Sequence, residues 1–138
     1  GVASEPRTQA ADHSKTESFT ANATRQGEVV GTPGYMAPEQ AAGLVDQFDA
    51  RTDIYGLGAV LYHLLTGRAP VTGSSAEEVI QKTQTEPPLP PCLLEPSVPK
   101  ALDAVCLKAL AQKRHDRYDS ALELAAEVKR WLADEPVH

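Results

Sequence analysis

Apolar residues recur at a helical spacing in the segment "DARTDIYGLGAVLYHLLTGRAP". They stand three or four positions apart, a pattern that predicts an α-helix, at Ile54, Leu57, Leu61, Leu64 and Leu65. Ala59, Val60 and Tyr62 occupy other faces, so the helix is apolar nearly all round, and such a helix belongs at the centre of a domain. Gly67 predicts its end, and Pro70 follows as expected after a helix stop.

A second helix is predicted from "SSAEEVIQ", because Ser74 with Glu77, or Ser75 with Glu78, makes a capping box. From residue 100 onward an apolar stripe predicts another helix, formed by Leu102, Val105, Cys106, Ala109 and Leu110.

The last predicted helix starts at Ser120, with Glu123 completing its cap. It is expected to bury Leu124, Val128, Trp131 and Leu132. A short helix is also predicted over 38–42, where Pro38 suits the first turn and Gly43 ends it. The connector "EPPLPPCLLEPSVP" is expected to lack regular structure. No strand-like alternation occurs, and the prediction is a mainly α fold of about five helices.

Residues 1–28 are polar, with Phe19 as the only aromatic side chain. Such a segment buries too little surface to offset its conformational entropy, so we expect it to be flexible. It is rich in hydroxyl groups, carried by Ser4, Thr8, Ser14, Thr16, Ser18, Thr20 and Thr24.

The composition excludes several classes of function. The chain has 138 residues and a net charge of −6 without a basic stripe, so nucleic acid is not an expected partner. No apolar run is long enough to span a membrane, and the start lacks a signal-peptide pattern.

Cys92 and Cys106 are too few for a zinc site or disulfide framework, and we expect reduced thiols in a cytoplasmic protein. Residue 1 is Gly, so the chain is expected to be processed or a piece of a longer protein.

Three separated motifs carry a family resemblance. "GTPGYMAPEQ", "DIYGLGAVLYHLLTGRAPV" and "KRHDRYDSALEL" resemble, in order and spacing, the C-terminal lobe of serine/threonine protein kinases of the bacterial, eukaryotic-like kind. The resemblance implies a partial kinase domain over 27–134, with a short tail at 135–138. Residues 1–26 correspond to a flexible activation loop by position and composition.

The resemblance also implies a role for each motif. In "GTPGYMAPE", the substrate-binding loop beneath the bound peptide corresponds to Gly31, Thr32, Pro33, Gly34 and Tyr35. Its Gly and Pro residues let the backbone turn sharply around that peptide. Thr32 is expected to hydrogen-bond the catalytic Asp and the neighbouring Lys of the catalytic loop, and a Thr there implies Ser/Thr substrates.

Two structural roles follow from the same resemblance. Glu39 corresponds to the acidic residue of the "APE" motif and Arg117 to its distant arginine partner, so they are expected to pair as carboxylate and guanidinium. Asp53 is expected to open the central helix and to accept hydrogen bonds from the catalytic-loop backbone. Gly56 and Gly58 predict close packing of neighbouring backbone against this helix. His63 is interpreted as a surface residue and not a metal ligand.

Thr24 corresponds to the first of two threonines that are often phosphorylated in this bacterial group, and phosphate can order such a loop. The second position holds Gln26, which departs from the pattern. Thr20 is a weaker candidate, and a linker without any regulated site is the alternative.

The sequence holds no G-x-G-x-x-G loop, no "VAIK"-like lysine, no "HRD" with its Asn and no "DFG". The N-lobe and catalytic loop would precede Gly1, so this chain is expected to bind no cofactor, while ATP and Mg would belong to the intact parent. We expect the parent to phosphorylate Ser/Thr of proteins, and this fragment to supply the substrate loop and helical base without being active alone. The expected partners are a protein substrate and the missing kinase parts. A non-catalytic binding module or pseudokinase-type scaffold is the alternative.

Overall fold

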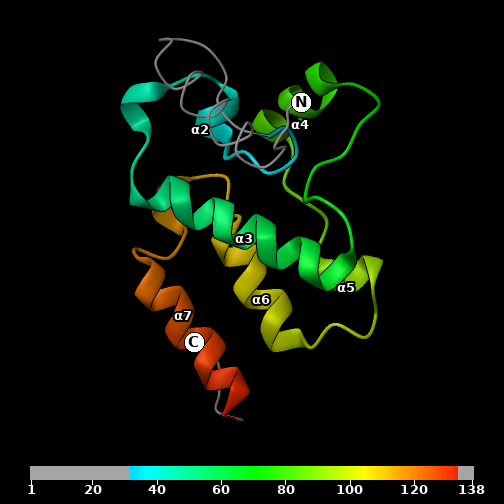
Figure 1. Cartoon of the computed structure of the whole chain (residues 1–138), viewed down its shortest axis with the longest axis vertical. Coiled ribbons are helices and arrows are strands. Elements are labelled where there is room, and N and C mark those ends of the chain that lie inside the picture. Colours follow the sequence, from blue (N-terminus) through cyan, green and yellow to red (C-terminus); the bar gives the residue numbers. More distant parts are fainter. Residues whose placement is uncertain (1–31, 134–138) are drawn as a thin grey trace, which may run out of the picture.

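The computed structural model describes residues 32–133, and this part of the chain holds six α-helices, two 3-10 turns and no strand. The helices are α2 (Pro38–Ala41), α3 (Ala50–Thr66), α4 (Ala76–Thr85), α5 (Pro91–Leu94), α6 (Lys100–Ala109) and α7 (Ala121–Leu132). The 3-10 turns are η1 (Val45–Gln47) and η2 (Arg114–Asp116). The mainly α class is therefore confirmed. Helix α3 crosses the middle of the molecule, with α2 and α4 on one side and α6 and α7 on the other (Figure 1).

Helix α3 begins one turn earlier than expected, because Asp49 caps it. The Asp49 carboxylate accepts hydrogen bonds from the backbone N–H groups of Arg51 (2.9 Å) and Thr52 (3.3 Å), and Thr52 Oγ1 accepts from Asp49 N (3.1 Å). This reciprocal cap places Asp53 inside the first turn, so the prediction that Asp53 opens the helix is wrong. The helix ends as predicted at Gly67, whose φ of 79° is a left-handed conformation that suits glycine.

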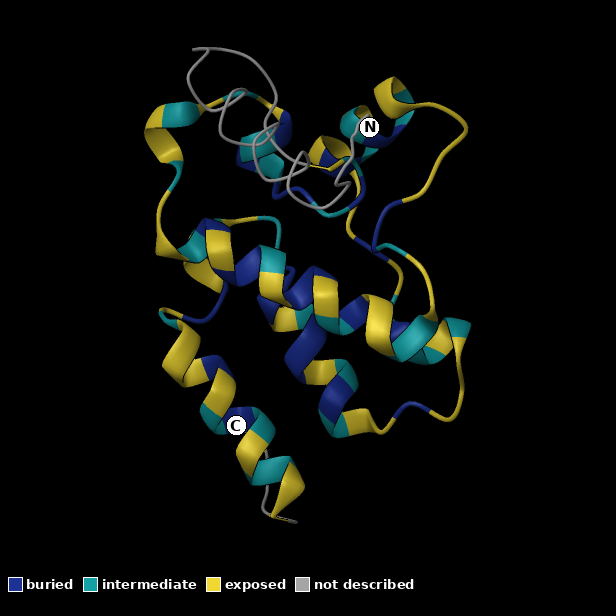
Figure 2. Cartoon of the chain, viewed as in Figure 1, coloured by how far each residue is buried: buried dark blue, intermediate teal, exposed yellow. Residues whose placement is uncertain are grey.

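One face of α3 packs against α6 and forms the core. Tyr55, Ala59 and Tyr62 lie in one buried cluster with Cys106 and Leu110. Ile54 lies in a second cluster with Val105 and Ala109. Figure 2 shows these buried parts of α3 where it meets α6. Both clusters include residues of the stripe predicted for α6, so that stripe is confirmed as its core-facing side.

Gly58 permits the closest approach between α3 and α6. A Cβ atom at this position would lie 2.7 Å from Ala109 Cβ and 3.2 Å from two atoms of the Leu110 side chain. The backbone of Gly58 also accepts a hydrogen bond from Cys106 Sγ at 3.5 Å. Burial raises the pKa of the Cys106 thiol to about 12, so it stays protonated. Close packing is therefore confirmed at Gly58, although the atoms that a Cβ would meet there belong to side chains of α6 and the following residue and not to backbone.

The opposite side of α3 is apolar but exposed, so the helix is apolar nearly all round, as predicted, and yet is buried on one side only. Leu57, Val60 and Leu64 have relative exposures of 45%, 54% and 75%. Together with α7 this side borders a groove of about 510 Å³ whose lining includes Leu61 and Val128. Nothing within residues 32–133 covers the three exposed side chains.

Two further local predictions are wrong. The proline-rich connector contains the short helix α5, because Pro91 occupies its first position, where the missing N–H needs no partner. In α7 the Ser120 cap and buried Leu124 are confirmed, but Trp131 is only half-buried and Leu132 is 70% exposed. Within the described residues nothing covers Leu132, the last residue of the helix.

Among the helices of the described part, none combines the length and apolar character needed to cross a bilayer.

Candidate functional site

The turn before α2 is held against a segment that lies far along the chain. Tyr35 N donates to Thr32 O at 3.1 Å. Gly34 has φ of 97°, and a Cβ there would lie 2.9 Å from Val71 O and 3.0 Å from Ala69 Cβ. Both the conformation and the space therefore demand glycine at this position. Gly31, the first residue predicted for this loop, lies outside the described residues.

Tyr35 is fixed at its far end by α3. Its hydroxyl hydrogen-bonds His63 Nδ1 at 2.6 Å, and the two ring centroids are 6.0 Å apart. His63 is exposed, as predicted, but the sequence did not indicate that it positions Tyr35. Within the described residues no group of His, Cys, Asp and Glu could hold a metal ion.

Glu39 and Arg117 form a buried, bidentate ion pair. Arg117 Nη1 donates to Glu39 Oε2 at 2.8 Å and Nη2 donates to Glu39 Oε1 at 2.9 Å, across 78 positions of sequence. The side chains are 4% and 0% exposed for Glu39 and Arg117, respectively. The pairing expected from sequence is confirmed. Thr52 Oγ1 adds a third hydrogen bond to Glu39 Oε2, at 2.7 Å, which the sequence did not indicate.

Every N–H group of the Arg117 side chain has an acceptor. Besides Glu39, it donates to the backbone oxygens of Ala111 (2.8 Å), Arg51 (3.0 Å) and Gln112 (3.2 Å). A guanidinium has five N–H donors, and these five bonds use all of them. Arg117 thus joins α2, the start of α3 and the segment after α6.

The electrostatics of Glu39 favour its charged form. Burial alone would raise its pKa, but hydrogen bonds from Arg117 and Thr52 outweigh burial and lower the pKa below the ordinary value of 4.5. A buried carboxylate that is charged and fully hydrogen-bonded holds its geometry, since any movement would strand one of the two charges.

A groove of about 590 Å³ lies in front of this ion pair, between the turn and α3. Of the predicted site residues it brings together Thr32, Tyr35 and Asp53. Pro33 and Gly34 shape the turn but do not line the groove. Asp53 is exposed at its edge, as the first-turn carboxylate of α3. Thr20 and Thr24 lie outside the described residues.

Gly56 also lines this groove and corrects one prediction. A Cβ built on Gly56 has no atom within 4 Å, so no neighbouring backbone in the described part packs against it. Gly56 and Gly58 lie on different sides of α3, and only Gly58 faces α6.

A family model and curated relatives of this chain all point to protein kinases. The family model described as "Protein kinase domain" matches residues 9–127. "Serine/threonine-protein kinase PknB" of Mycobacterium tuberculosis is 44% identical over 113 residues, which are 82% of this chain and 18% of that protein. "Probable serine/threonine-protein kinase PknB" of Bifidobacterium longum is 40% identical over 112 residues, 81% of this chain and 16% of that protein.

A third relative, "Probable serine/threonine-protein kinase SCO3848" of Streptomyces coelicolor, is 40% identical over 114 residues, 83% of this chain and 17% of that protein. The chain therefore spans less than a fifth of the length of these curated relatives.

Proposed function

Because the chain belongs to the protein kinase family, we propose that it is the substrate-binding part of a serine/threonine protein kinase. The complete enzyme would transfer the γ-phosphate of ATP to Ser or Thr side chains of proteins. This chain would supply the substrate loop and the helical base that supports it.

The observation that carries the proposal is the Glu39–Arg117 pair. It joins the helix directly after the substrate loop to the segment that follows α6, with both carboxylate oxygens and all five guanidinium donors engaged. Catalysis of phosphoryl transfer depends on positioning of the reacting groups, so a loop that binds substrate must be held rigidly. A buried pair of this kind provides that rigidity.

The groove between the loop and α3 suits the docking of a catalytic loop. Thr32 would hydrogen-bond the catalytic Asp and its neighbouring Lys, and Asp53 would accept hydrogen bonds from catalytic-loop backbone. The open space at Gly56 supports this arrangement, because backbone can approach a residue without Cβ. The exposed Leu57, Val60 and Leu64 would be covered by the same missing part of the domain.

ATP and Mg would bind to that missing part. The sequence contains no glycine-rich loop, strand lysine, "HRD" or "DFG", and these supply the groups that hold nucleotide and metal in a kinase. Within the whole enzyme, Thr24 is the first candidate for activating phosphorylation and Thr20 the second, in a domain that works in the cytoplasm. The isolated chain would be inactive.

A chimaera tests the proposal. The corresponding segment of Mycobacterium tuberculosis PknB is replaced by this chain, and phosphate transfer from ATP to a Ser/Thr peptide is measured together with ATP binding. We expect an active chimaera. Asp53→Asn and Thr32→Val should lower its kcat, while Asp119→Asn, at an exposed pair with Arg51, serves as the matched control.

The outcome also separates the alternatives. A chimaera that folds and binds ATP but transfers no phosphate would contradict the enzyme and favour a pseudokinase-type scaffold. For the isolated chain, calorimetry with Mg-ATP should show no heat of binding. A clear binding isotherm would overturn the proposed inactivity of the fragment.

A further inference from the structure

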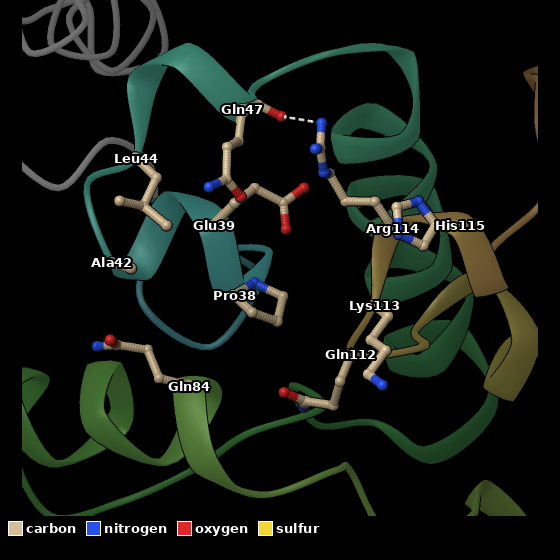
Figure 3. A pocket seen from close by; sticks show the side chains of 10 residues that line it. All are labelled: Pro38, Glu39, Ala42, Leu44, Gln47, Gln84, Gln112, Lys113, Arg114 and His115. Atoms are coloured by element: carbon tan, nitrogen blue, oxygen red, sulfur yellow. Dashed lines mark hydrogen bonds between the residues drawn. The ribbon is translucent and has the colours of Figure 1, made fainter.

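A separate cavity, of about 380 Å³, lies on the other side of α2 from the groove that Thr32, Tyr35 and Asp53 line, and it shares no lining residue with that groove. Three segments that are distant in sequence form it: α2 with η1, the end of α4, and the residues after α6. Figure 3 shows these segments facing one another across the space. Its size falls within the usual range of ligand-binding clefts.

One wall of this cavity is apolar. Pro38 of α2, Ala42 at its C-terminal cap and the half-exposed Leu44 lie together on this side (Figure 3). Glu39 also lines the cavity, but Arg117 and Thr52 occupy its oxygens. The wall therefore offers an apolar side chain a place to pack.

The facing wall is basic, with Lys113, Arg114 and His115 in succession (Figure 3). In the described part of the chain, neither the Lys113 side chain nor the His115 side chain has a hydrogen-bond or ion-pair partner. This cluster stands out in a chain whose net charge is −6. Cationic groups of the lining also outnumber its single carboxylate, Glu39.

Arg114 is held in place while keeping donors free. Its Nη1 donates to Gln47 O at 2.6 Å and to Asp49 Oδ2 at 2.8 Å. These bonds leave Nε and Nη2 without an acceptor among the described residues. A guanidinium that is already oriented loses little entropy when it binds a carboxylate.

Carboxamides complete the lining. Gln84 Nε2 donates to Ile80 O at 3.2 Å, and Gln112 Nε2 donates to Glu86 O at 2.9 Å. Their oxygens are left available to accept hydrogen bonds. Such acceptors suit the N–H groups of an extended peptide backbone.

We propose that this cavity docks a short acidic peptide segment of a partner protein. A peptide carboxylate would bind Arg114, Lys113 and His115, and a neighbouring apolar side chain would pack on Pro38, Ala42 and Leu44. The peptide backbone would donate to Gln84 and Gln112. Because the cavity is separate from the groove in front of α2, the partner could stay bound while that groove is occupied. The proposal does not depend on the proposed kinase function.

A peptide array tests it with the full 138-residue chain. The array presents short peptides in which Leu, Glu, Lys and Gly are permuted, so acidic, basic and neutral members have equal length. We expect selective retention of peptides that combine Glu with Leu. The selected peptide is then labelled, and its affinity is measured by fluorescence polarisation.

Matched variants locate the binding. Lys113→Glu should weaken binding by about tenfold or more, as expected from loss of a charge-assisted contact. Lys100→Glu makes the same charge change at an exposed lysine away from the cavity and should leave affinity unchanged. Leu44→Ala should weaken binding, whereas Leu89→Ala, at a similarly exposed leucine, should not. These substitutions are at exposed positions, and circular dichroism checks that each variant is folded.

Three results would overturn the proposal. The array could show no preference for acidic peptides. Alternatively, Lys113→Glu and Lys100→Glu could weaken binding equally, which would indicate that only the overall charge of the protein matters. Retention of purely apolar peptides that is insensitive to Lys113→Glu would place binding on the exposed side of α3 instead.

Discussion

The two long faces of α3 differ in what covers them. The face that includes Tyr55, Gly58 and Tyr62 is buried against α6. The face that includes Gly56, Leu57 and Val60 borders the groove and is open. We call these the covered face and the open face. The same helix therefore packs closely on one side and presents apolar surface on the other.

This difference shows how similar residues acquire different roles. Gly58 and Gly56 are two positions apart, yet a Cβ would clash at the first and meet nothing at the second. On the covered face, glycine is required for packing within the chain. On the open face, no contact within the described residues requires a glycine at position 56. We relate the absence of a side chain there to the proposed docking of the rest of the kinase domain.

The largest effect on stability is expected at Arg117, which joins α2, the start of α3 and the segment after α6. Replacing Arg117 with Met strands the buried Glu39 charge, so the free energy of unfolding should fall by about 3–5 kcal/mol. Urea denaturation followed by circular dichroism measures it. Asp119→Asn removes the partner of Arg51 at an exposed pair and should cost at most about 1 kcal/mol. Equal losses in the two variants would contradict the structural role of the buried pair.

Gly58→Ala should produce the next largest effect. The added Cβ would lie 2.7 Å from Ala109 Cβ, and overpacking of this kind costs about 1–3 kcal/mol. The gain in helix propensity, roughly 1 kcal/mol, offsets part of this. Thermal unfolding should therefore show a lower midpoint. A midpoint at or above that of the parent chain would mean that α3 and α6 separate more easily than the structure indicates.

Acid should weaken the same Glu39–Arg117 ion pair. The folded-state pKa of Glu39 is lowered from 4.5, so its contribution to stability is fully present above that value. It is lost as the pH falls through the lower pKa of the folded state. We expect a smaller loss than in the Arg117→Met variant, because the protonated side chain keeps part of its hydrogen bonding. Urea midpoints are measured from above pH 4.5 down through the lowered pKa of Glu39. They should depend less on pH in the Glu39→Gln variant than in the parent chain.

The smallest effect, of opposite sign, is expected on the open face. Gly56→Ala meets no atom within 4 Å and should stabilise the isolated chain by up to about 1 kcal/mol through helix propensity. The same substitution in the chimaeric kinase should lower activity, because a methyl group would obstruct the docked catalytic loop. Unchanged activity would show that nothing approaches the backbone at Gly56.

Several features of this protein could be predicted from the sequence because they depend on neighbouring residues. The helical spacing within α3 and α6, the stop at Gly67 and the cap at Ser120 are local patterns with local causes. The Glu39–Arg117 pairing was also predictable, but only through the resemblance of separated motifs to a known family. Local patterns could not indicate a contact across 78 positions.

Other features were decided only by the tertiary structure. Which glycine of α3 is crowded, that His63 binds Tyr35 and that Thr52 supports Glu39 all depend on how distant elements pack. The cavity behind α2 arises where three such segments meet. Sequence periodicity identifies an apolar side chain, but the element packed against it determines whether that side chain is buried. Ile54 and Leu57 belong to the same predicted stripe, yet Ile54 is 1% exposed and Leu57 is 45% exposed for this reason.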